Sequence, residues 1–169
     1  MGLNFYNVDS AYCVYLEKYD TNVPYVANGK ERRPFVGILI TINSMDYYAP
    51  LTSPKPKHLT MKNSHDFIKI DGGRWGAINL NKMIPVDKKS LKICDMNIGP
   101  NDPGNIRAYK FLLKKQLNWC NANGNQIISK AIHLHKMITQ RNVYPRLKER
   151  CCDFSLLEHK CLEYNRLTI

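Results

Sequence analysis

The pattern of apolar and polar positions divides the chain into a part built of short strands and a part built of helices. Before residue 100, short apolar runs alternate with Gly, Pro, Asn and Asp, which is typical of strands joined by tight turns. After residue 104, apolar residues recur three and four positions apart, as on amphipathic helices. We therefore expect an α+β fold, a compact and strongly curved antiparallel sheet or barrel decorated by helices, with a helical C-terminal half.

One hairpin dominates the predicted sheet. The run from Phe35 to Ile42 is almost continuously apolar, which is typical of a strand buried on both faces. A turn over residues 43–46 returns the chain through a second strand, residues 47–51. Arg33 and the Thr52-Ser53 pair should then lie close together at one edge of the sheet. Weaker strands are predicted at residues 5–8, 67–70, 75–80 and 91–96, and residues 83–86 form a brief apolar segment.

Four helices are predicted from local signals. The first follows Asp9 or Ser10, either of which can cap it. Two longer helices are predicted to carry their apolar stripes to Cys120 and to about Arg141. The last is predicted to begin with a capping box formed by Ser155 and Glu158. A basic row on the second helix is either a solvated face or a rail for phosphates; it contains Arg107, Lys110 and Lys114.

The segment after the hairpin carries the candidate chemistry. Two hydroxyls, two lysines and a histidine follow the strand, and Pro54 and Pro56 restrain the backbone between them, so that Ser53 and Lys55 are expected to be extended. One interpretation is a proline-rich surface turn. The other is a phosphate-binding site, since no acidic residue occurs from residue 47 to residue 65. The polar residues are Thr52, Ser53, Lys55, Lys57 and His58.

Length, composition and charge limit the number of domains and the classes of binding partner. The 169 residues, 44% of them hydrophobic, are enough for one domain with a substantial core, and we expect a single domain over residues 1–169. The formal charge of +11 favours nucleic acid or an anionic membrane as partner. The longest apolar run is too short to span a bilayer, and the first residues lack the features of a secretory signal. The sequence gives little support for a role at a membrane surface, because no helix combines lysines with a wide aromatic face. We expect a cytoplasmic protein.

The cysteines and histidines do not suggest a metal site or any cofactor. The six cysteines form no CxxC pair and have no histidine at zinc-finger spacing. His133 and His135 are two positions apart, which on a helix points them in different directions. We expect reduced cysteines that fill small spaces in the core. The adjacent pair Cys151-Cys152 has no explanation in the sequence.

Several blocks along the chain together resemble the ToxN and AbiQ family, the protein toxins of type III toxin-antitoxin and phage abortive-infection systems, with the CptN branch closest. These blocks run from Phe35-Val36-Gly37-Ile38 through Pro50-Leu51-Thr52-Ser53-Pro54-Lys55 and Ile78-Asn79-Leu80-Asn81-Lys82-Met83-Ile84-Pro85 to Cys151-Cys152-Asp153-Phe154-Ser155-Leu156-Leu157-Glu158. The resemblance implies a curved sheet related to the Kid and MazF toxins. It also implies a metal-independent endoribonuclease that leaves a 2′,3′-cyclic phosphate and is inhibited by a small repeat RNA. The toxin itself processes this RNA into pseudoknots, with which it forms a closed assembly.

The same resemblance implies the site. Thr52, Ser53 and Lys55 match the family's motif directly, and Arg33 matches a basic residue that is lysine in some members. A tyrosine that some members use in the preceding loop has no clear equivalent: Tyr25 is nearest, and Gly29 is the alternative occupant of its place.

Those residue types suit RNA cleavage without a metal ion, in which the neighbouring 2′-hydroxyl attacks the phosphorus. In our hypothesis Thr52 and Ser53 hydrogen-bond the phosphate and the 2′-hydroxyl, and Lys55 and Arg33 neutralise the charge that grows in the transition state. Lys55 could also protonate the leaving oxygen if burial among other cations makes it more acidic. His58 is the alternative acid or base. Ser53 is not expected to be a nucleophile, because no fixed base partner is suggested beside it.

The remaining cations and aromatic residues are candidates for RNA binding. Tyr48, Tyr109 and Trp75 are possible stacking platforms, although aromatic residues at such positions are more often part of a core. The resemblance implies cellular and phage RNA as substrates, and the alternative function is a basic RNA-binding domain without catalysis. Phosphate contacts are predicted for Lys30, Arg32, Lys57, Lys62, Lys110, Lys114, Lys115, Arg146 and Lys148. The last two belong to a basic stretch that begins at Arg141.

Overall fold

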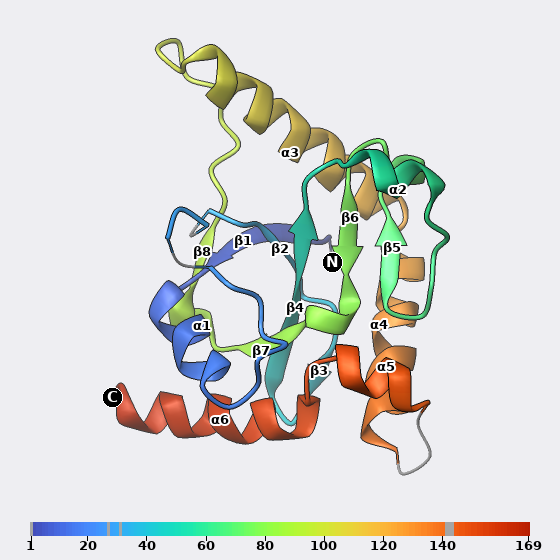
Figure 1. Ribbon diagram of the computed structural model, residues 1–169. Coiled ribbons are helices and arrows are strands. Elements are labelled where there is room, and N and C mark those ends of the chain that lie inside the picture. The colour runs from blue at the N-terminus through green and yellow to red at the C-terminus, as the bar shows by residue number, and fades with distance from the viewer. Residues whose placement is uncertain (1, 27, 31, 141–143) are drawn as a thin grey trace.

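The computed structural model describes residues 2–26, 28–30, 32–140 and 144–169. The strands are β1 (Asn4–Val8), β2 (Phe35–Gly37), β3 (Thr41–Ile42), β4 (Met45–Thr52), β5 (Phe67–Lys69), β6 (Ala77–Asn79), β7 (Ile84–Val86) and β8 (Leu91–Ile93). The helices are α1 (Ser10–Glu17), α2 (Pro56–Thr60), α3 (Gly104–Ala122), α4 (Gly124–Thr139), α5 (Pro145–Arg150) and α6 (Phe154–Leu167). Strands therefore dominate the first part of the chain and helices the second, as predicted (Figure 1).

The eight strands form one antiparallel sheet centred on β4. The order along the sheet is β5-β6-β4-β2-β1-β8, while β3 and β7 pair with β4 outside this path. The first half of β4 pairs with β3 and β7, and its second half pairs with β2 and β6. A central strand that changes partners along its length bends the sheet. The sheet does not close on itself, so the predicted antiparallel sheet is confirmed and its barrel form is excluded.

The apolar run from Phe35 to Ile42 is not one strand, as predicted, but two. β2 and β3 pair with opposite ends of β4. The link between them is hydrogen-bonded to β4 at Tyr47, because Leu39 N donates to Tyr47 O and Tyr47 N donates to Ile40 O. The hairpin turn lies at Asn43 and Ser44, whose φ angles of 50° and 64° match a two-residue turn with both residues left-handed.

Gly37 ends β2 where the ring of Tyr48 crosses the backbone. A Cβ atom on Gly37 would lie 2.2 Å from Tyr48 Cδ1, so only glycine fits beneath this ring. Tyr48 is 1% exposed, and its ring packs edge-on against Tyr6. The prediction that Tyr48 could stack on RNA is therefore wrong, because its apolar ring is part of the core.

The helix ends confirm one predicted cap and correct another. Asp9 accepts a hydrogen bond from Ala11 N and begins α1. At α6 the cap is Asp153, which accepts from Leu156 N, rather than Ser155. Glu158 does not fold back to the helix start. Its Oε1 instead accepts from Tyr47 Oη at 2.6 Å and lies 3.0 Å from His135 Nε2, which ties α6 to β4 and α4.

One helix of the C-terminal half was not predicted. α5 forms within the basic stretch, where Pro145 occupies its first position. α4 ends at Thr139, while Arg141 falls outside the described residues. The expectation of reduced, space-filling cysteines is confirmed, since all six are free and buried.

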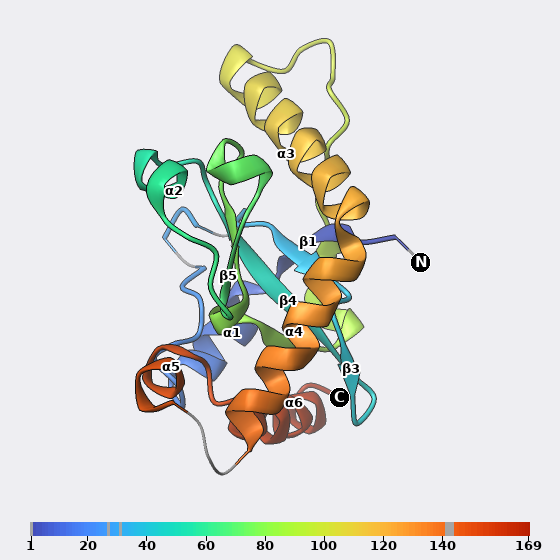
Figure 2. The same cartoon turned by 90° about the vertical axis from the view of Figure 1, so that its right-hand side faces the viewer.

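The helices surround the sheet unevenly. α6 packs on β7, α1 and α4, and α4 runs across the sheet over β4 (Figure 2). α3 covers the sheet with its second half only, and its first half projects beyond the sheet in both views (Figures 1 and 2). Leu113 and Cys120 of its predicted stripe are buried, but Tyr109 is 36% exposed. The projecting part of α3 therefore keeps a partly exposed surface beside the end of β4.

Candidate active site

The end of β4 and the start of β2 bring the predicted residues together. Phe35 pairs with Pro50, and Leu51 N donates to Pro34 O at 2.9 Å, so Arg33 follows in register opposite Thr52. One pocket of about 480 Å³ opens at this edge. Arg33, Thr52, Ser53 and Lys55 all line it, together with Gly29, Lys30 and Arg32. The juxtaposition predicted from the hairpin is thus present.

A short helix immediately follows the candidate residues. Lys55 is extended, with φ −137° and ψ 145°, and Pro56 begins α2. His58 N donates to Lys55 O at 2.9 Å, and Lys55 N donates to His58 Nδ1 at 3.3 Å. These two bonds fold the backbone of Lys55 onto α2 while its side chain remains exposed. The exposure leaves the ammonium group available to an anion but removes the burial on which its role as a proton donor depended.

His58 is not placed as the catalytic acid or base that the sequence suggested. The side chain is 1% exposed, packs near Phe67, and does not line the pocket. Its Nδ1 accepts a hydrogen bond, so the proton of the neutral ring is on Nε2. Burial, and then the charges of Lys57 and Lys55, lower the pKa of His58. The structure therefore favours His58 as a residue that positions Lys55.

Two glycines that the sequence did not assign to the site support this segment from behind. Gly73 has φ +94°, and a Cβ atom there would lie 2.4 Å from His58 O. Gly76 has φ +96° and approaches the backbone of Thr52 in the same way. Both glycines belong to the turn between β5 and β6. The sequence predicted strands on both sides of this turn but gave no sign of these contacts, because a close approach between distant segments has no local sequence pattern.

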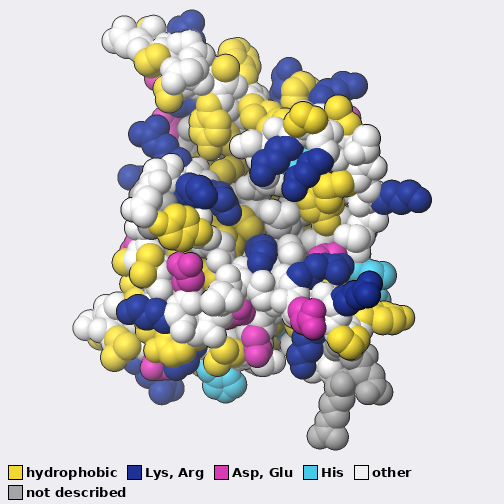
Figure 3. All heavy atoms as spheres, viewed as in Figure 1, with side chains coloured by type: hydrophobic (Ala, Val, Ile, Leu, Met, Phe, Trp, Pro, Cys, Tyr) yellow, Lys and Arg dark blue, Asp and Glu magenta, His cyan; other side chains and the backbone are white. Residues whose placement is uncertain are grey.

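The pocket is strongly cationic on its sheet side. Lys30, Arg32, Arg33 and Lys55 contribute four positive charges to its lining, and none of the described residues that line it is acidic. Burial lowers the pKa of Arg33, but a guanidinium stays charged at neutral pH. Figure 3 shows Lys and Arg side chains gathered where α2, α3 and the end of β4 meet, whereas most Asp and Glu side chains visible on this face lie lower. An anion such as a phosphate fits this environment.

The second wall of the pocket comes from α3. It consists of uncharged side chains that reach from Asn105 to Gln116 and include Ile106, Tyr109, Leu112 and Leu113. Tyr109 Oη donates to Arg32 O at 3.2 Å, which joins α3 to the loop before β2. Gln116 was not predicted as a site residue. It is 2% exposed and donates from Nε2 to Trp75 O at 2.7 Å, which fixes the turn that carries Gly73 and Gly76.

Lys110 does not form the free phosphate contact predicted for it. Its Nζ lies 2.9 Å from Asp102 Oδ2 and 3.3 Å from Asp95 Oδ2, and its side chain is only 13% exposed. Asp95 and Asp102 therefore already neutralise its charge.

The remaining residues predicted to bind RNA, Trp75 among them, lie outside the pocket. One ring face of Trp75 is covered by Lys115 Nζ, 4.3 Å from the ring centroid. Lys57, Lys62 and Lys114 are exposed on nearby elements but do not line the pocket. Arg146 and Lys148 lie on α5, at the opposite end of the molecule from the projecting part of α3 in both ribbon views.

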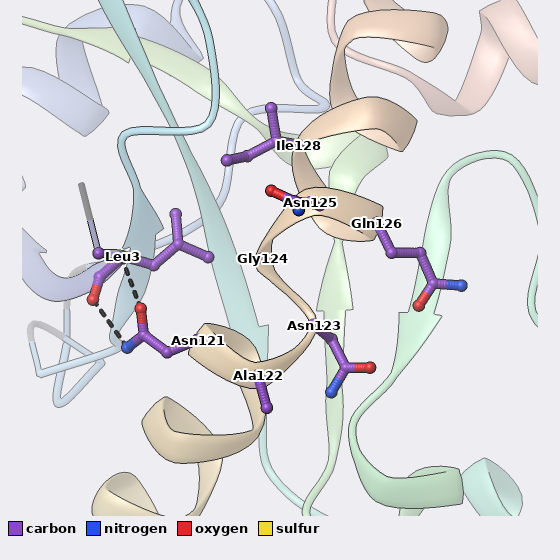
Figure 4. A pocket seen from close by; sticks show the side chains of 9 residues that line it. Leu3, Asn121, Ala122, Asn123, Gly124, Asn125, Gln126 and Ile128 are labelled. Atoms are coloured by element: carbon purple, nitrogen blue, oxygen red, sulfur yellow. Dashed lines mark hydrogen bonds between the residues drawn. The ribbon is translucent and has the colours of Figure 1, made fainter.

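A different pocket lies where the start of the chain meets the junction of α3 and α4 (Figure 4). Its polar lining is made of amides, and Asn121 is bound to both backbone groups of Leu3, at 2.8 and 3.1 Å. Over the parts of the chain that the structure describes, no charged side chain lines it. This pocket lacks the cations and hydroxyls that phosphate chemistry requires.

The sequence model described as "Toxin ToxN, type III toxin-antitoxin system" matches residues 4–162. The chain belongs to the ToxN family. Endoribonuclease ToxN of Pectobacterium atrosepticum is 33% identical, with 97% of this chain and 95% of that protein aligned. Endoribonuclease ToxN of Bacillus thuringiensis subsp. kurstaki is also 33% identical, over 95% of this chain and 83% of that protein. The family and the endoribonuclease class implied by the resemblance are thereby confirmed.

Solved ToxN-family structures have the same fold. A structure described as "selective toxin inhibition by a non-coding RNA pseudoknot" superposes with a TM-score of 0.83 at 32% identity, covering 98% of this chain and 99% of the other. Another, described as "A processed non-coding RNA regulates a bacterial antiviral system", gives 0.78 at 33% identity, covering 95% and 98%. AbiQ, a lactococcal anti-phage endoribonuclease, gives 0.81 at 24% identity, covering 98% and 99%, a likeness that concerns the fold alone. Within the part of the chain that the structure describes, no helix is long and apolar enough to cross a membrane.

Proposed function

We propose that this ToxN-family chain is a metal-independent endoribonuclease toxin whose active site is the pocket at the end of β4. The observation that carries the proposal is the convergence of Arg33, Thr52, Ser53 and Lys55 on one cationic pocket. Two hydroxyl groups supply neutral hydrogen-bond donors and acceptors, and two side chains supply permanent positive charge. This set matches the needs of a phosphodiester that passes through a more highly charged transition state.

In the proposed reaction the ribose 2′-oxygen attacks the adjacent phosphorus in line with the 5′-oxygen of the next nucleotide. The bond from the 2′-oxygen to phosphorus forms as the bond from phosphorus to the 5′-oxygen breaks. The products are therefore a 2′,3′-cyclic phosphate and a free 5′-hydroxyl. The 2′-hydroxyl gives up its proton and the leaving 5′-oxygen gains one, so the exchange balances without a covalent enzyme intermediate.

Each of the four residues has one role in this reaction. Thr52 and Ser53 orient the 2′-hydroxyl and the phosphate by hydrogen bonds from the end of a central strand, where Thr52 is paired with Ala77 of β6. Lys55 and Arg33 face the phosphate oxygens and stabilise the charge that develops on them. Loss of one such donor typically lowers the rate about a hundredfold to a thousandfold.

The biological setting follows from the family. We infer that the chain acts in the cytoplasm as the toxin of a type III toxin-antitoxin system. Cellular and phage RNA would be its substrates, and a small repeat-derived RNA pseudoknot would be its inhibitor. In this proposal the toxin cuts the precursor of that RNA into units and then forms a closed assembly with them. The solved structures named for such an RNA support the inference.

The test is cleavage of single-stranded RNA in EDTA, with detection of cyclic-phosphate ends. Ser53→Ala and Lys55→Ala should each reduce cleavage about a hundredfold or more while the RNA is still bound. Lys136→Ala is the matched control, because Lys136 is an exposed cation of α4 that does not line the pocket. Binding without cleavage by the unmodified protein would instead establish the alternative, a non-catalytic basic RNA-binding domain.

A further inference from the structure

The two walls of the pocket differ in chemistry. Among the described residues, the sheet side contributes all of the lining cations and both candidate hydroxyls. α3 contributes only uncharged side chains, although it also carries Arg107, Lys110, Lys114 and Lys115 on its other faces. A nucleotide has the same division, with a charged phosphate on one side of the sugar and, on the other, an uncharged flat base whose faces can stack on apolar side chains.

Tyr109 is the aromatic residue of the α3 wall. Its ring is partly exposed, and it lies between Ile106 and Leu113 along the helix. The bond from its hydroxyl to Arg32 O holds the ring on the loop that delivers Lys30 and Arg33. A ring that is already oriented loses little conformational entropy when a base stacks on it.

We infer that Tyr109, with the apolar residues next to it on α3, forms a slot for an unpaired nucleobase adjacent to the scissile phosphate. The inference rests on the proposed function, because the phosphate sets which base reaches the slot. Stacking on tyrosine tolerates any base but requires one that is unpaired. The slot therefore selects single-stranded over paired RNA without selecting a sequence. Neither of the other aromatic candidates lines the pocket: Tyr48 is buried, and Trp75 lies outside it with Lys115 over one ring face.

The experiment measures binding of a single-stranded 2′-O-methyl RNA, which lacks the attacking hydroxyl and cannot be cut. Tyr109→Leu should weaken binding about tenfold or more, the usual effect of losing one base-aromatic stack. The salt dependence should not change, because no charge is removed. Phe111→Leu is the matched control: Phe111 is an exposed aromatic of the same helix, 56% exposed, and does not line the pocket.

Tyr109→Phe separates stacking from the bond to Arg32. This variant keeps the ring and should bind within about twofold of the unmodified protein, since a stacked base contacts the ring and not the hydroxyl. If Tyr109→Phe and Tyr109→Leu are equally weak, the residue positions the loop and the base slot does not exist. Equal binding by Tyr109→Leu and Phe111→Leu would overturn the inference as well.

A second measurement begins with the unmodified protein, so its first result does not depend on the folding of any variant. One nucleotide after another in the RNA is replaced by an abasic unit, and binding to the unmodified protein is measured. One position should weaken binding about tenfold, and Tyr109→Leu should have no further effect on that RNA. A flat abasic profile refutes the slot. Tyr109-dependent binding without any cleavage of ordinary RNA would leave the slot intact and refute the proposed nuclease instead.

Discussion

Gly76 lies directly against the backbone of Thr52. A Cβ atom on Gly76 would be 2.1 Å from Thr52 O and 3.2 Å from Ser53 C, and its φ of +96° is one that other residues rarely adopt. Ala77, which follows Gly76 in the chain, pairs with Thr52 across β6 and β4. The turn between β5 and β6 therefore sets the position of the two candidate hydroxyl residues, although it contributes no chemistry of its own.

Gly76→Ala is predicted to lower RNA cleavage at least a hundredfold. The added methyl group must push Thr52 and Ser53 away from their positions, and a displacement of about 1 Å in an active site can have an effect of that size. The strained φ should also lower the free energy of unfolding by about 2 kcal/mol. Cleavage rates and urea unfolding measure the two effects.

Gly72→Ala is the control for this change. Gly72 also has a positive φ, +63°, but a Cβ atom added there would have no atom of the described residues within 4 Å beyond its chain neighbours. We expect about 1 kcal/mol of destabilisation and unchanged cleavage. Equal loss of cleavage in the two variants would show that strain in the turn, and not its approach to Thr52, controls the site.

His58→Phe tests whether this histidine positions Lys55 or transfers protons. Phenylalanine fills the buried space but cannot accept the hydrogen bond from Lys55 N. The unpaired N–H should lower stability by about 1 to 2 kcal/mol. Cleavage should fall about tenfold at most, much less than in Ser53→Ala. A loss as large as that of Ser53→Ala, in a His58→Phe protein that remains folded, would restore His58 as a catalytic residue.

The same histidine predicts how stability changes with pH. The pKa of His58 is lowered in the folded protein from an ordinary value of 6.5, chiefly by burial. The contribution of neutral, buried His58 to the free energy of unfolding is therefore fully present above about pH 6.5. It is lost as the pH falls below that value, because the unfolded chain takes up the proton more readily. Urea unfolding between pH 5 and 8 should show this loss in the unmodified protein. His58→Phe should show a smaller one.

Asp66 and Arg150 should stabilise the contact between α5 and the segment after α2. Arg150 Nε and Nη2 lie 2.6 and 2.9 Å from the two carboxylate oxygens of Asp66, joining α5 to the segment after α2. Burial alone would raise the pKa of Asp66, but hydrogen bonds from Arg150 and Ser64 lower it overall. The pair therefore contributes above about pH 3.8, and its contribution is lost as the pH falls below that value.

Asp66→Asn is expected to lower the free energy of unfolding at neutral pH by about 1 to 3 kcal/mol, since Asp66 is buried but Arg150 is half-exposed. Lys160→Ala is the comparison. It removes the Lys160–Glu163 pair within α6, whose Glu163 side chain is 49% exposed, and the loss should stay below about 1 kcal/mol. Equal losses in chemical unfolding would refute the role assigned to Asp66.

Lys30 and Lys110 should differ in their effect on RNA binding. Lys30 lines the cationic side of the pocket, whereas Lys110 is neutralised by Asp95 and Asp102. Lys30→Ala should reduce the slope of log affinity against log salt concentration by about 0.7, the contribution of one phosphate contact on a single strand. Lys110→Ala should leave the slope unchanged. A lower slope for Lys110→Ala would mean that RNA displaces its acidic partners.

The sequence by itself determined the strand-rich first part, the helical second part and the convergence of Arg33, Thr52, Ser53 and Lys55. Each depends on local information: the period of apolar residues, the turn signal after Ile42, and the antiparallel return of a hairpin. Such features are short in range, so the order of residues is enough to specify them. The motif around Thr52 and Ser53 was recognisable for the same reason.

Only the tertiary structure decided which side chains remain available. Tyr48 lies beneath the surface because Gly37 lets its ring cross the backbone, and Lys110 is neutralised by two aspartates that precede it in a loop. His58 faces the core because α2 turns it inward, and Gly76 approaches Thr52 from a different hairpin. Burial and partners at these positions arise from contacts between segments that are distant in the chain, and no periodicity or local motif encodes such contacts.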